Sequence, residues 1–185
     1  MEYITKEYTE LLKQLHNTKK AFGSGNPNIF LLDGRHIEIL KKAKRVLDYG
    51  CGKGSFVRYV QENLPDVEIV GYDPAVEEYS KLPEGHFDFI WCTDVLEHIE
   101  PELIDNIINH LKELSTDYLY LSANCTKAKK HLADGRNAHL IIQPKEWWNE
   151  KLISIGTILK EEVTITRYGK EKELESINYH TIIKK

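Results

Sequence analysis

The stretch Val46-Leu47-Asp48-Tyr49-Gly50-Cys51-Gly52-Lys53-Gly54 decides the fold class of this 185-residue chain. It has the pattern of a buried strand that runs into a glycine-rich turn and then into a helix beginning near Ser55. Glycine lets the backbone turn tightly and approach a ligand at a place where a Cβ atom would obstruct it. Gly50, Gly52 and Gly54 therefore predict a ligand-binding loop, and a tight turn without a ligand is the alternative.

Two other glycine motifs do not fit this register. The dinucleotide fingerprint GxGxxG would need glycine where Ser55 stands. The phosphate-binding loop GxxxxGK[ST] needs a lysine after its last glycine, whereas Lys53 precedes Gly54 and the upstream glycine is missing. Neither of these two motifs therefore matches the register of the loop.

An acidic residue follows the second predicted strand. Asp73 stands in Val70-Gly71-Tyr72-Asp73-Pro74, 19 residues after Gly54. A carboxylate at this strand tip can accept hydrogen bonds from both hydroxyls of a ribose that lies across adjacent strands. An Asp-Pro turn with a purely structural role is the alternative.

The rest of the chain alternates short apolar runs with helical patterns, as parallel α/β sheets do. We expect strands at 44–49, 68–72, 87–93 and 117–123, and a terminal antiparallel hairpin of 162–168 and 176–183 around 169–173. We expect helices at 5–22, 29–44, 55–63 and 101–114, and one that opens at Pro144. The first two helices form an N-terminal arm.

Composition and charge limit the class of protein. With 41% apolar residues the chain can bury one substantial core, so we expect a single domain. No run of about 18 apolar residues and no signal-like start are present, which predicts a cytoplasmic protein without a membrane partner. Cys51, Cys92 and Cys125 have no paired spacing, so neither disulfides nor a zinc site are expected.

The charge distribution argues against duplex DNA as a partner. The segment 46–118 carries 16 acidic and 4 basic residues, and the flanking segments are only mildly basic. A duplex-DNA binder concentrates basic residues on one surface. A nucleotide-sized ligand remains compatible with this pattern.

Three motifs together resemble the class I S-adenosylmethionine-dependent methyltransferases: VLDYGCGKG, IVGYDP and FDFIWCTDVLEHI, within 46–121. The resemblance implies a Rossmann-like sheet with a C-terminal antiparallel hairpin, S-adenosylmethionine (SAM) as cofactor and S-adenosylhomocysteine (SAH) as product. It divides the chain into an arm (1–45), a cofactor-binding core (46–123) and a substrate loop with the hairpin (124–185). The residues that it assigns to the cofactor are Asp48, Gly50, Gly52 and Gly54 at the methionine end, Asp73 and Pro74 at the ribose, and Asp94 and Val95 near the adenine or the methyl group.

One departure from the family pattern concerns the segment 74–86. It is too short for the usual helix and third strand, so we expect the sheet to lack its edge strand and the adenine pocket to be open or closed by the arm. Tyr8, His16, Lys19 and Phe22 are the candidates for such a lid. The favoured alternative is an amphipathic helix with a solvated basic face.

The motif after the fourth family strand supplies a candidate catalytic residue. Asp94-Val95-Leu96-Glu97-His98-Ile99 resembles the LEH(I/V) signature of small-molecule methyltransferases. His98 is a candidate base, and a histidine that packs the turn and caps a helix is the alternative. We expect Glu97 to be a solvated or helix-capping carboxylate.

A dense polar stretch at 131–140 follows the fifth family strand, and its continuation to Trp147 resembles a segment of quinone-biosynthesis O-methyltransferases. We expect His139 and Arg136 to contact the substrate, with a structural network as the alternative. A metal site built from His131, Asp134 and His139 is not expected, because their spacing matches no closed ligand pattern.

The function implied by the resemblance is methyl transfer to an oxygen or nitrogen of a small molecule. DNA modification is disfavoured, because Thr93-Asp94-Val95-Leu96 stands where DNA amino-methylating enzymes carry a DPPY-type motif, and no Pro-Cys dipeptide is present. Two alternatives remain. One is methylation of an RNA or protein end group, and the other is a non-catalytic, cofactor-binding regulatory subunit.

Overall fold

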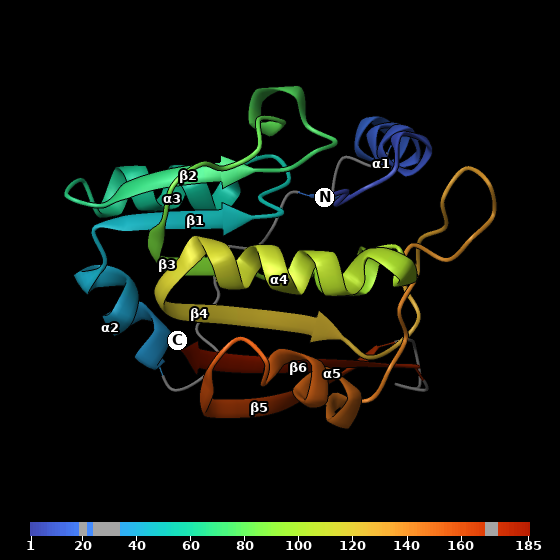
Figure 1. Ribbon diagram of the computed structural model, residues 1–185. Coiled ribbons are helices and arrows are strands. Elements are labelled where there is room, and N and C mark those ends of the chain that lie inside the picture. Colours follow the sequence, from blue (N-terminus) through green and yellow to red (C-terminus); the bar gives the residue numbers. More distant parts are fainter. Residues whose placement is uncertain (19–21, 24–33, 169–173) are drawn as a thin grey trace.

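The computed structural model describes residues 1–18, 22–23, 34–168 and 174–185, and there it forms one six-stranded sheet (Figure 1). The strand order is β2-β1-β3-β4-β6-β5. The strands are β1 (Arg45–Tyr49), β2 (Glu68–Tyr72), β3 (Phe87–Cys92), β4 (Ser115–Asn124), β5 (Thr157–Tyr168) and β6 (Leu174–Lys184). The first four pair in parallel, and β6 and β5 are antiparallel. The predicted methyltransferase-type sheet is confirmed.

The sheet ends at β2, as the short link after it predicted. β1 pairs with β2 on one side and with β3 on the other, and no further strand covers β2 in the described part of the chain. The link to β3 holds only a short 3₁₀ helix, Glu77–Tyr79. The 13 residues from Pro74 to His86 cannot supply both a crossover helix and a strand. A crossover connection alone needs about a dozen residues.

Helices cover both faces of the sheet (Figure 1). On one face, α4 (Ile104–Leu114) and α5 (Lys145–Leu152) pack against the strands, and on the other face α2 (Arg35–Lys42) and α3 (Ser55–Asn63) do. The apolar side chains that fill these two layers include Leu47, Ile90, Leu111 and Trp148 on the first face and Leu40, Val46, Val60 and Trp91 on the second. Burial on both faces explains why the central strands are continuous apolar runs in the sequence.

The N-terminal helices are shorter than predicted. The first, α1 (Lys6–Thr18), ends before Phe22, and the second begins at Arg35, after Gly34 in the left-handed conformation (φ 77°). A left-handed residue cannot continue a right-handed helix, so the helix starts after it. The predicted breaker residues 24–27 and the start of the predicted second helix, 29–33, lie outside the described residues.

Other element boundaries also differ from the predictions. The helix predicted at 101–114 opens as a 3₁₀ turn, Pro101–Leu103, before α4. Pro144 caps α5 in an extended conformation and is not its first helical residue. The two hairpin strands are longer than predicted because they pair with each other over their full length, and the predicted turn at 169–173 lies outside the described residues.

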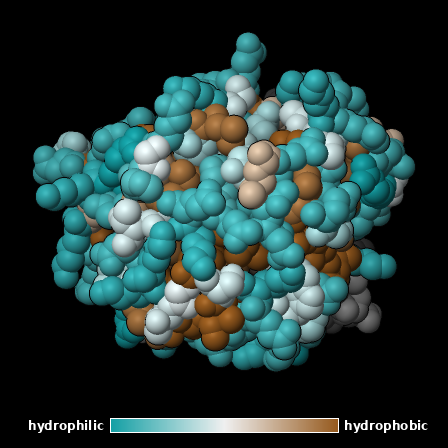
Figure 2. Space-filling view, in the orientation of Figure 1, coloured by the Kyte–Doolittle hydropathy of each residue, from teal (hydrophilic) through white to brown (hydrophobic). Residues whose placement is uncertain are grey.

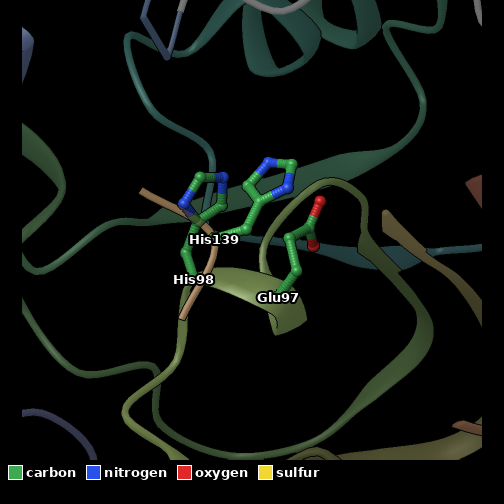
Figure 3. A group of neighbouring side chains, drawn as sticks. All are labelled: Glu97, His98 and His139. Carbon is green, nitrogen blue, oxygen red and sulfur yellow. The ribbon is translucent and has the colours of Figure 1, made fainter. Parts of the chain in front are cut away.

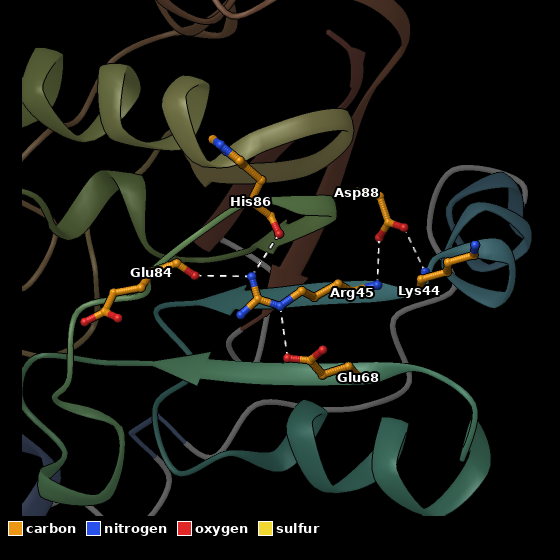
Figure 4. Close-up of polar contacts among 6 residues, drawn as sticks. All are labelled: Lys44, Arg45, Glu68, Glu84, His86 and Asp88. Atoms are coloured by element: carbon orange, nitrogen blue, oxygen red, sulfur yellow. Dashed lines mark hydrogen bonds and ion pairs between the residues drawn. The ribbon is translucent and has the colours of Figure 1, made fainter.

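Polar contacts around Arg45 join the amino ends of three strands (Figure 4). The Arg45 guanidinium bonds Glu68 Oε1 at 2.9 Å and the carbonyl oxygens of Glu84 at 3.2 Å and His86 at 2.9 Å. Asp88 Oδ1 accepts the backbone N–H of Arg45 at 2.9 Å. These contacts lie at the end of the strands away from the glycine loop, so they serve the fold.

We expect Asp88→Ala to lower the free energy of unfolding by about 1 to 2 kcal/mol. The change removes the acceptor for two backbone N–H groups, those of Lys44 (2.8 Å) and Arg45 (2.9 Å), at the start of β1. Urea denaturation measures the change. Asp66→Ala, at an exposed carboxylate, serves as the control and should alter stability by less than about 0.5 kcal/mol. Equal effects of the two substitutions would contradict the structural role of Asp88.

Hydrophilic side chains cover most of the surface in Figure 2, and hydrophobic side chains show between them in patches. The exposed large apolar side chains include Ile153, just after α5, and Val163 and Ile165 of the edge strand β5. In the described part of the chain, no helix is both long and apolar enough to cross a membrane. The apolar side chains are thus concentrated between the sheet and its helices.

Candidate active site

A cavity of about 920 Å³ lies at the carboxyl ends of the parallel strands. Its wall includes the tips of β1 and β2 at Tyr49 and Tyr72, and the end of β4 at Asn124. Residues of α1 and of the loop after β4 complete the wall. In parallel α/β sheets this is the edge at which ligands bind, because loops and helix N-termini converge there.

The glycine loop forms part of this wall through Gly50 and Gly52. Both have left-handed backbones, with φ values of 79° and 53°. A Cβ atom on Gly50 would overlap the side chain of Val95, and one on Gly52 would overlap the backbone of Gly23. The Gly23 carbonyl accepts the Lys53 N–H at 2.7 Å. The N-terminal arm and the third family motif therefore pack directly on the glycine loop.

Gly54 has a different role from the other two glycines. It precedes α3 with a left-handed φ of 71° and is not part of the cavity wall. A Cβ atom there would overlap the hydroxyl end of Tyr79. The packing of Tyr79 explains why a glycine stands here. The predicted contact of Gly54 with the cofactor has no support in the geometry of the cavity.

Asp73 lies in the cavity wall and also shapes its own turn. Its Oδ2 accepts the Gly52 N–H and its Oδ1 the Ala75 N–H, both at 2.9 Å. Asp73 therefore does stabilise a turn, which was the alternative to ligand binding. Each carboxylate oxygen still keeps a second lone pair that can accept a ligand hydroxyl. Burial raises the pKa of Asp73, and the two backbone N–H groups and nearby His16 oppose that rise. Pro74 follows in the same wall.

Asp48 places a second carboxyl group in the cavity wall, at the end of β1. Burial and, to a smaller extent, the charge of Asp73 raise the pKa of Asp48 to about 8. The raised pKa brings the protonated form of Asp48 into the neutral pH range. That form can donate a hydrogen bond where an ionised aspartate can only accept one.

The inner face of α1 forms a third part of the wall. Tyr8, Leu12 and His16 line the cavity and recur every four residues, the spacing of one helix face. The Tyr8 hydroxyl donates a hydrogen bond to the carbonyl of His98 at 2.5 Å. The opposite face of α1 is exposed to solvent, as predicted for an amphipathic helix. The buried face of the same helix covers the cavity. Phe22 lies in the wall as well, and Lys19 lies outside the described residues.

Asp94 and Val95 follow β3 and line the same cavity. Asp94 has a left-handed backbone (φ 54°), which is uncommon for a residue other than glycine and concentrates at functional sites. Its N–H donates to Ser122 Oγ of β4 at 3.1 Å. The Asp94 carboxylate is accessible from the cavity, and the surrounding protein raises its pKa.

Two histidines, His98 and His139, lie side by side in the cavity wall. The ring centroids of His98 and His139 lie 4.8 Å apart. His98 Nδ1 bonds the Ala138 carbonyl at 2.6 Å, and His139 Nδ1 bonds the Thr126 carbonyl at 2.5 Å. A carbonyl can only accept, so each Nδ1 carries the proton and each Nε2 has a free lone pair. Burial lowers the pKa of His139 and lowers that of His98 to about 3, so both rings are neutral at neutral pH.

The prediction of a solvated Glu97 is wrong. The Glu97 side chain is 0% exposed, and neither carboxylate oxygen has a hydrogen-bond partner among the described residues. Its backbone carbonyl accepts the N–H groups of Leu140 and Ile141 at 2.8 and 3.0 Å. The tight turn Leu96–His98 points the side chain inward, and burial raises the Glu97 pKa well above its usual value.

A sequence model described as a methyltransferase domain matches residues 8–149, which is most of the chain and includes most of the residues of the cavity wall. The chain belongs to the methyltransferase domain family. The match takes in the glycine loop, Asp73, Asp94 and His139. SAM is the methyl donor of such enzymes, so the cofactor predicted from the three motifs is confirmed.

Solved structures show the same fold. A magnesium protoporphyrin IX methyltransferase from Synechocystis PCC 6803, solved with bound SAM, is 16% identical over 97% of this chain and 98% of its own, with a TM-score of 0.63. A 1,6-didemethyltoxoflavin-N1-methyltransferase from Burkholderia thailandensis is 14% identical over 97% and 90%, with a TM-score of 0.61. A SAM-dependent methyltransferase from Archaeoglobus fulgidus is 17% identical over 96% and 94%, with a TM-score of 0.57. No curated protein sequence matches the chain.

The polar loop of this methyltransferase divides into a surface part and a cavity part. Arg136 is exposed, pairs with Asp134 (Nε–Oδ2 2.6 Å) and does not line the cavity, so its predicted contact with substrate has no support in the geometry. His131 is exposed and forms a backbone bridge with Asn137. His139 alone of these residues lies in the cavity wall. The structure thus does not bring His131, Asp134 and His139 together, because their turn faces solvent.

Proposed function

We propose that this methyltransferase transfers the methyl group of SAM to an oxygen or nitrogen of a small molecule. The observation that carries the proposal is one cavity that contains the glycine loop, Asp73, Asp94 and His139 in its wall. The proposed cofactor-binding groups and the candidate catalytic groups therefore share one cavity. At about 920 Å³ the cavity has the size of small-ligand sites.

The cofactor side of the proposal rests on groups that fit SAM. Asp73 offers two buried oxygens with free lone pairs for the ribose hydroxyls. Gly50 and Gly52 of the glycine loop lie in the same wall. Asp48 lies beside them for the methionine end, and Pro74, Asp94 and Val95 line the space that remains for the adenine and the methyl group.

The chemistry asks little of the protein beyond positioning. The sulfonium of SAM drives an in-line displacement, so the enzyme must hold the acceptor atom opposite the methyl group and exclude water. A neutral amine can attack directly, whereas a hydroxyl must lose its proton. The candidate acceptors for that proton are the Nε2 atoms of His98 and His139, and burial lowers the pKa of both rings, which makes them weaker bases than a free histidine.

The cover that α1 forms over one side of the cavity is consistent with a small methyl acceptor. Tyr8 and Leu12 of α1 close it from one side, and Tyr8 is tied to the main chain of His98. The Synechocystis and Burkholderia enzymes are named for small-molecule substrates, which agrees with the proposal.

The test is transfer of a labelled methyl group from SAM into fractions of a cell extract. We expect the labelled methyl group to appear in the small-molecule fraction. With the Asp73→Ala protein in place of the unmodified protein, we expect no label in any fraction. Label in RNA or protein would favour the end-group alternative. No transfer by a protein that binds SAH would favour the regulatory subunit.

A further inference from the structure

Three potential metal ligands meet at one point of the cavity wall (Figure 3). Glu97 and His98 come from the turn after β3, and His139 comes from the loop after β4. One ligand atom from each lies within 4.8 Å of the others, and no second group of three such side chains is found in the described ranges. Ligands of a bound ion at about 2.1 Å lie about 3 to 3.5 Å apart, so small side-chain rotations would bring these three into coordination.

The histidine tautomers suit coordination. Each ring donates its Nδ1–H to a main-chain carbonyl, that of Ala138 for His98 and that of Thr126 for His139. This contact fixes the ring and leaves Nε2 as the coordinating atom. Metal-binding histidines in proteins are held in the same way, with the second nitrogen bonded to a carbonyl or carboxylate.

Glu97 supplies an independent reason to expect a cation. Its carboxyl group is fully buried, and neither oxygen accepts a hydrogen bond of good geometry in the described structure, although the backbone N–H groups of Glu97 and Asn124 lie close enough to lower its pKa slightly. A protonated carboxyl would also need an acceptor for its O–H. Buried polar groups without partners are rare and indicate a bound ion, a water or strain. A metal ion beside the two Nε2 atoms would pair with this carboxylate.

We propose that Glu97, His98 and His139 bind a divalent transition-metal ion in the wall of the cavity, and that the ion activates a hydroxyl group of the methyl acceptor. Two nitrogens and one oxygen suit zinc, manganese, iron or cobalt better than calcium or magnesium, which prefer oxygen ligands. Three protein ligands leave coordination positions open, as catalytic metal sites do. Asp94, beside the group, adds a second negative charge.

This inference rests on the proposed function and narrows it to an oxygen acceptor. A hydroxyl oxygen bound to the ion loses its proton to water more readily, because the ion lowers the pKa of the hydroxyl. The oxygen then attacks the methyl carbon of SAM. The C–O bond forms, the S–C bond breaks, and its electron pair stays on the sulfur of SAH. The ion is unchanged, and no redox partner is needed.

The first test measures binding of Co²⁺ to the metal-stripped, full-length protein by its absorption spectrum and by thermal unfolding. We expect one Co²⁺ per chain and a rise of about 5 °C in the midpoint of unfolding at saturating metal. His139→Ala should weaken Co²⁺ binding at least tenfold, because it removes one ligand. The matched control is His131→Ala in the same loop, which should leave binding unchanged. The absence of Co²⁺ binding, or equal losses in the two variants, would overturn the proposal.

A second variant separates metal binding from folding. Glu97→Gln keeps the shape of the side chain and removes its charge, so without metal it should unfold at or above the temperature of the unmodified protein. It should lose the Co²⁺-induced rise, whereas Glu146→Gln, at an exposed carboxylate, should keep it. A Glu97→Gln protein that retains the full rise would overturn the assignment of Glu97.

Calorimetry with SAH and a transfer assay with chelator distinguish the inference from the proposed function. We expect chelator to abolish methyl transfer and to leave SAH affinity unchanged. Transfer that continues at full rate after removal of metal would overturn the activation step and leave the proposed function standing. Loss of SAH binding by the unmodified protein would instead overturn the proposed function itself.

Discussion

Asp73→Ala is expected to weaken binding of SAH at least 100-fold. Two hydrogen bonds from ribose hydroxyls to a buried carboxylate contribute about 1.5 to 3 kcal/mol each. Their loss exceeds the roughly 2.7 kcal/mol that corresponds to a 100-fold change in the dissociation constant. Isothermal titration calorimetry of SAH against both proteins measures the effect.

Controls for this substitution must account for the turn that Asp73 organises. The carboxylate accepts the N–H groups of Gly52 and Ala75, so the alanine variant should also lose about 1 to 2 kcal/mol of stability. Asp73→Asn keeps one accepting oxygen and should bind SAH with intermediate affinity. Asp66→Ala, at an exposed carboxylate, should bind as the unmodified protein does. A folded alanine variant with affinity within about threefold of the original would contradict the assigned role.

Gly50→Ala is expected to lower the free energy of unfolding by about 2 to 5 kcal/mol, which urea denaturation measures. The left-handed backbone (φ 79°) costs a residue with a Cβ atom about 1 to 2 kcal/mol. The new Cβ would also overlap the side chain of Val95, and such overpacking costs about 1 to 3 kcal/mol. The substitution acts on the contact that joins the glycine loop to the segment after β3.

Two further variants separate these two causes. Gly135 is also left-handed (φ 90°), but nothing lies within 4 Å of its Cβ position, so Gly135→Ala should show only the backbone cost. Adding Val95→Ala to Gly50→Ala should restore the part of the loss that the overlap causes, once the cost of Val95→Ala alone is subtracted. If Gly50→Ala costs no more than Gly135→Ala, the close packing of Gly50 on Val95 is wrong.

Local sequence patterns were sufficient for the central sheet. An apolar strand followed by spaced glycines, and an aspartate after the next apolar strand, are patterns that can be recognised within short stretches of sequence. The absence of the edge strand followed from the length of one segment. The 13 residues from Pro74 to His86 are too few for a crossover helix and a strand. Element ends were less well predicted. They depend on caps such as Gly34, whose conformation the apolar pattern does not specify.

Gly50 and Gly52 were the most predictable site residues, because a left-handed backbone requires glycine there. The side chains of the loops were harder to predict. Arg136 looked functional because a polar cluster in a loop is typical of binding sites, yet its turn faces solvent and it pairs with Asp134. Glu97 looked solvated because charged residues are rarely buried without a partner. His16 had only its helical spacing with Tyr8 to indicate that it faces the cavity.

The sequence by itself indicated the family and the cofactor, through three motifs that resemble those of class I methyltransferases, and its hydrophobic pattern located the central strands. Only the tertiary structure brought Glu97 and His98 to His139, across 40 residues of chain, and turned both imidazoles so that their Nε2 atoms are free. Such a meeting depends on how two loops from neighbouring strands pack under α1. The glycine loop decides which cofactor the protein uses, and the packed loops decide what chemistry can take place beside it.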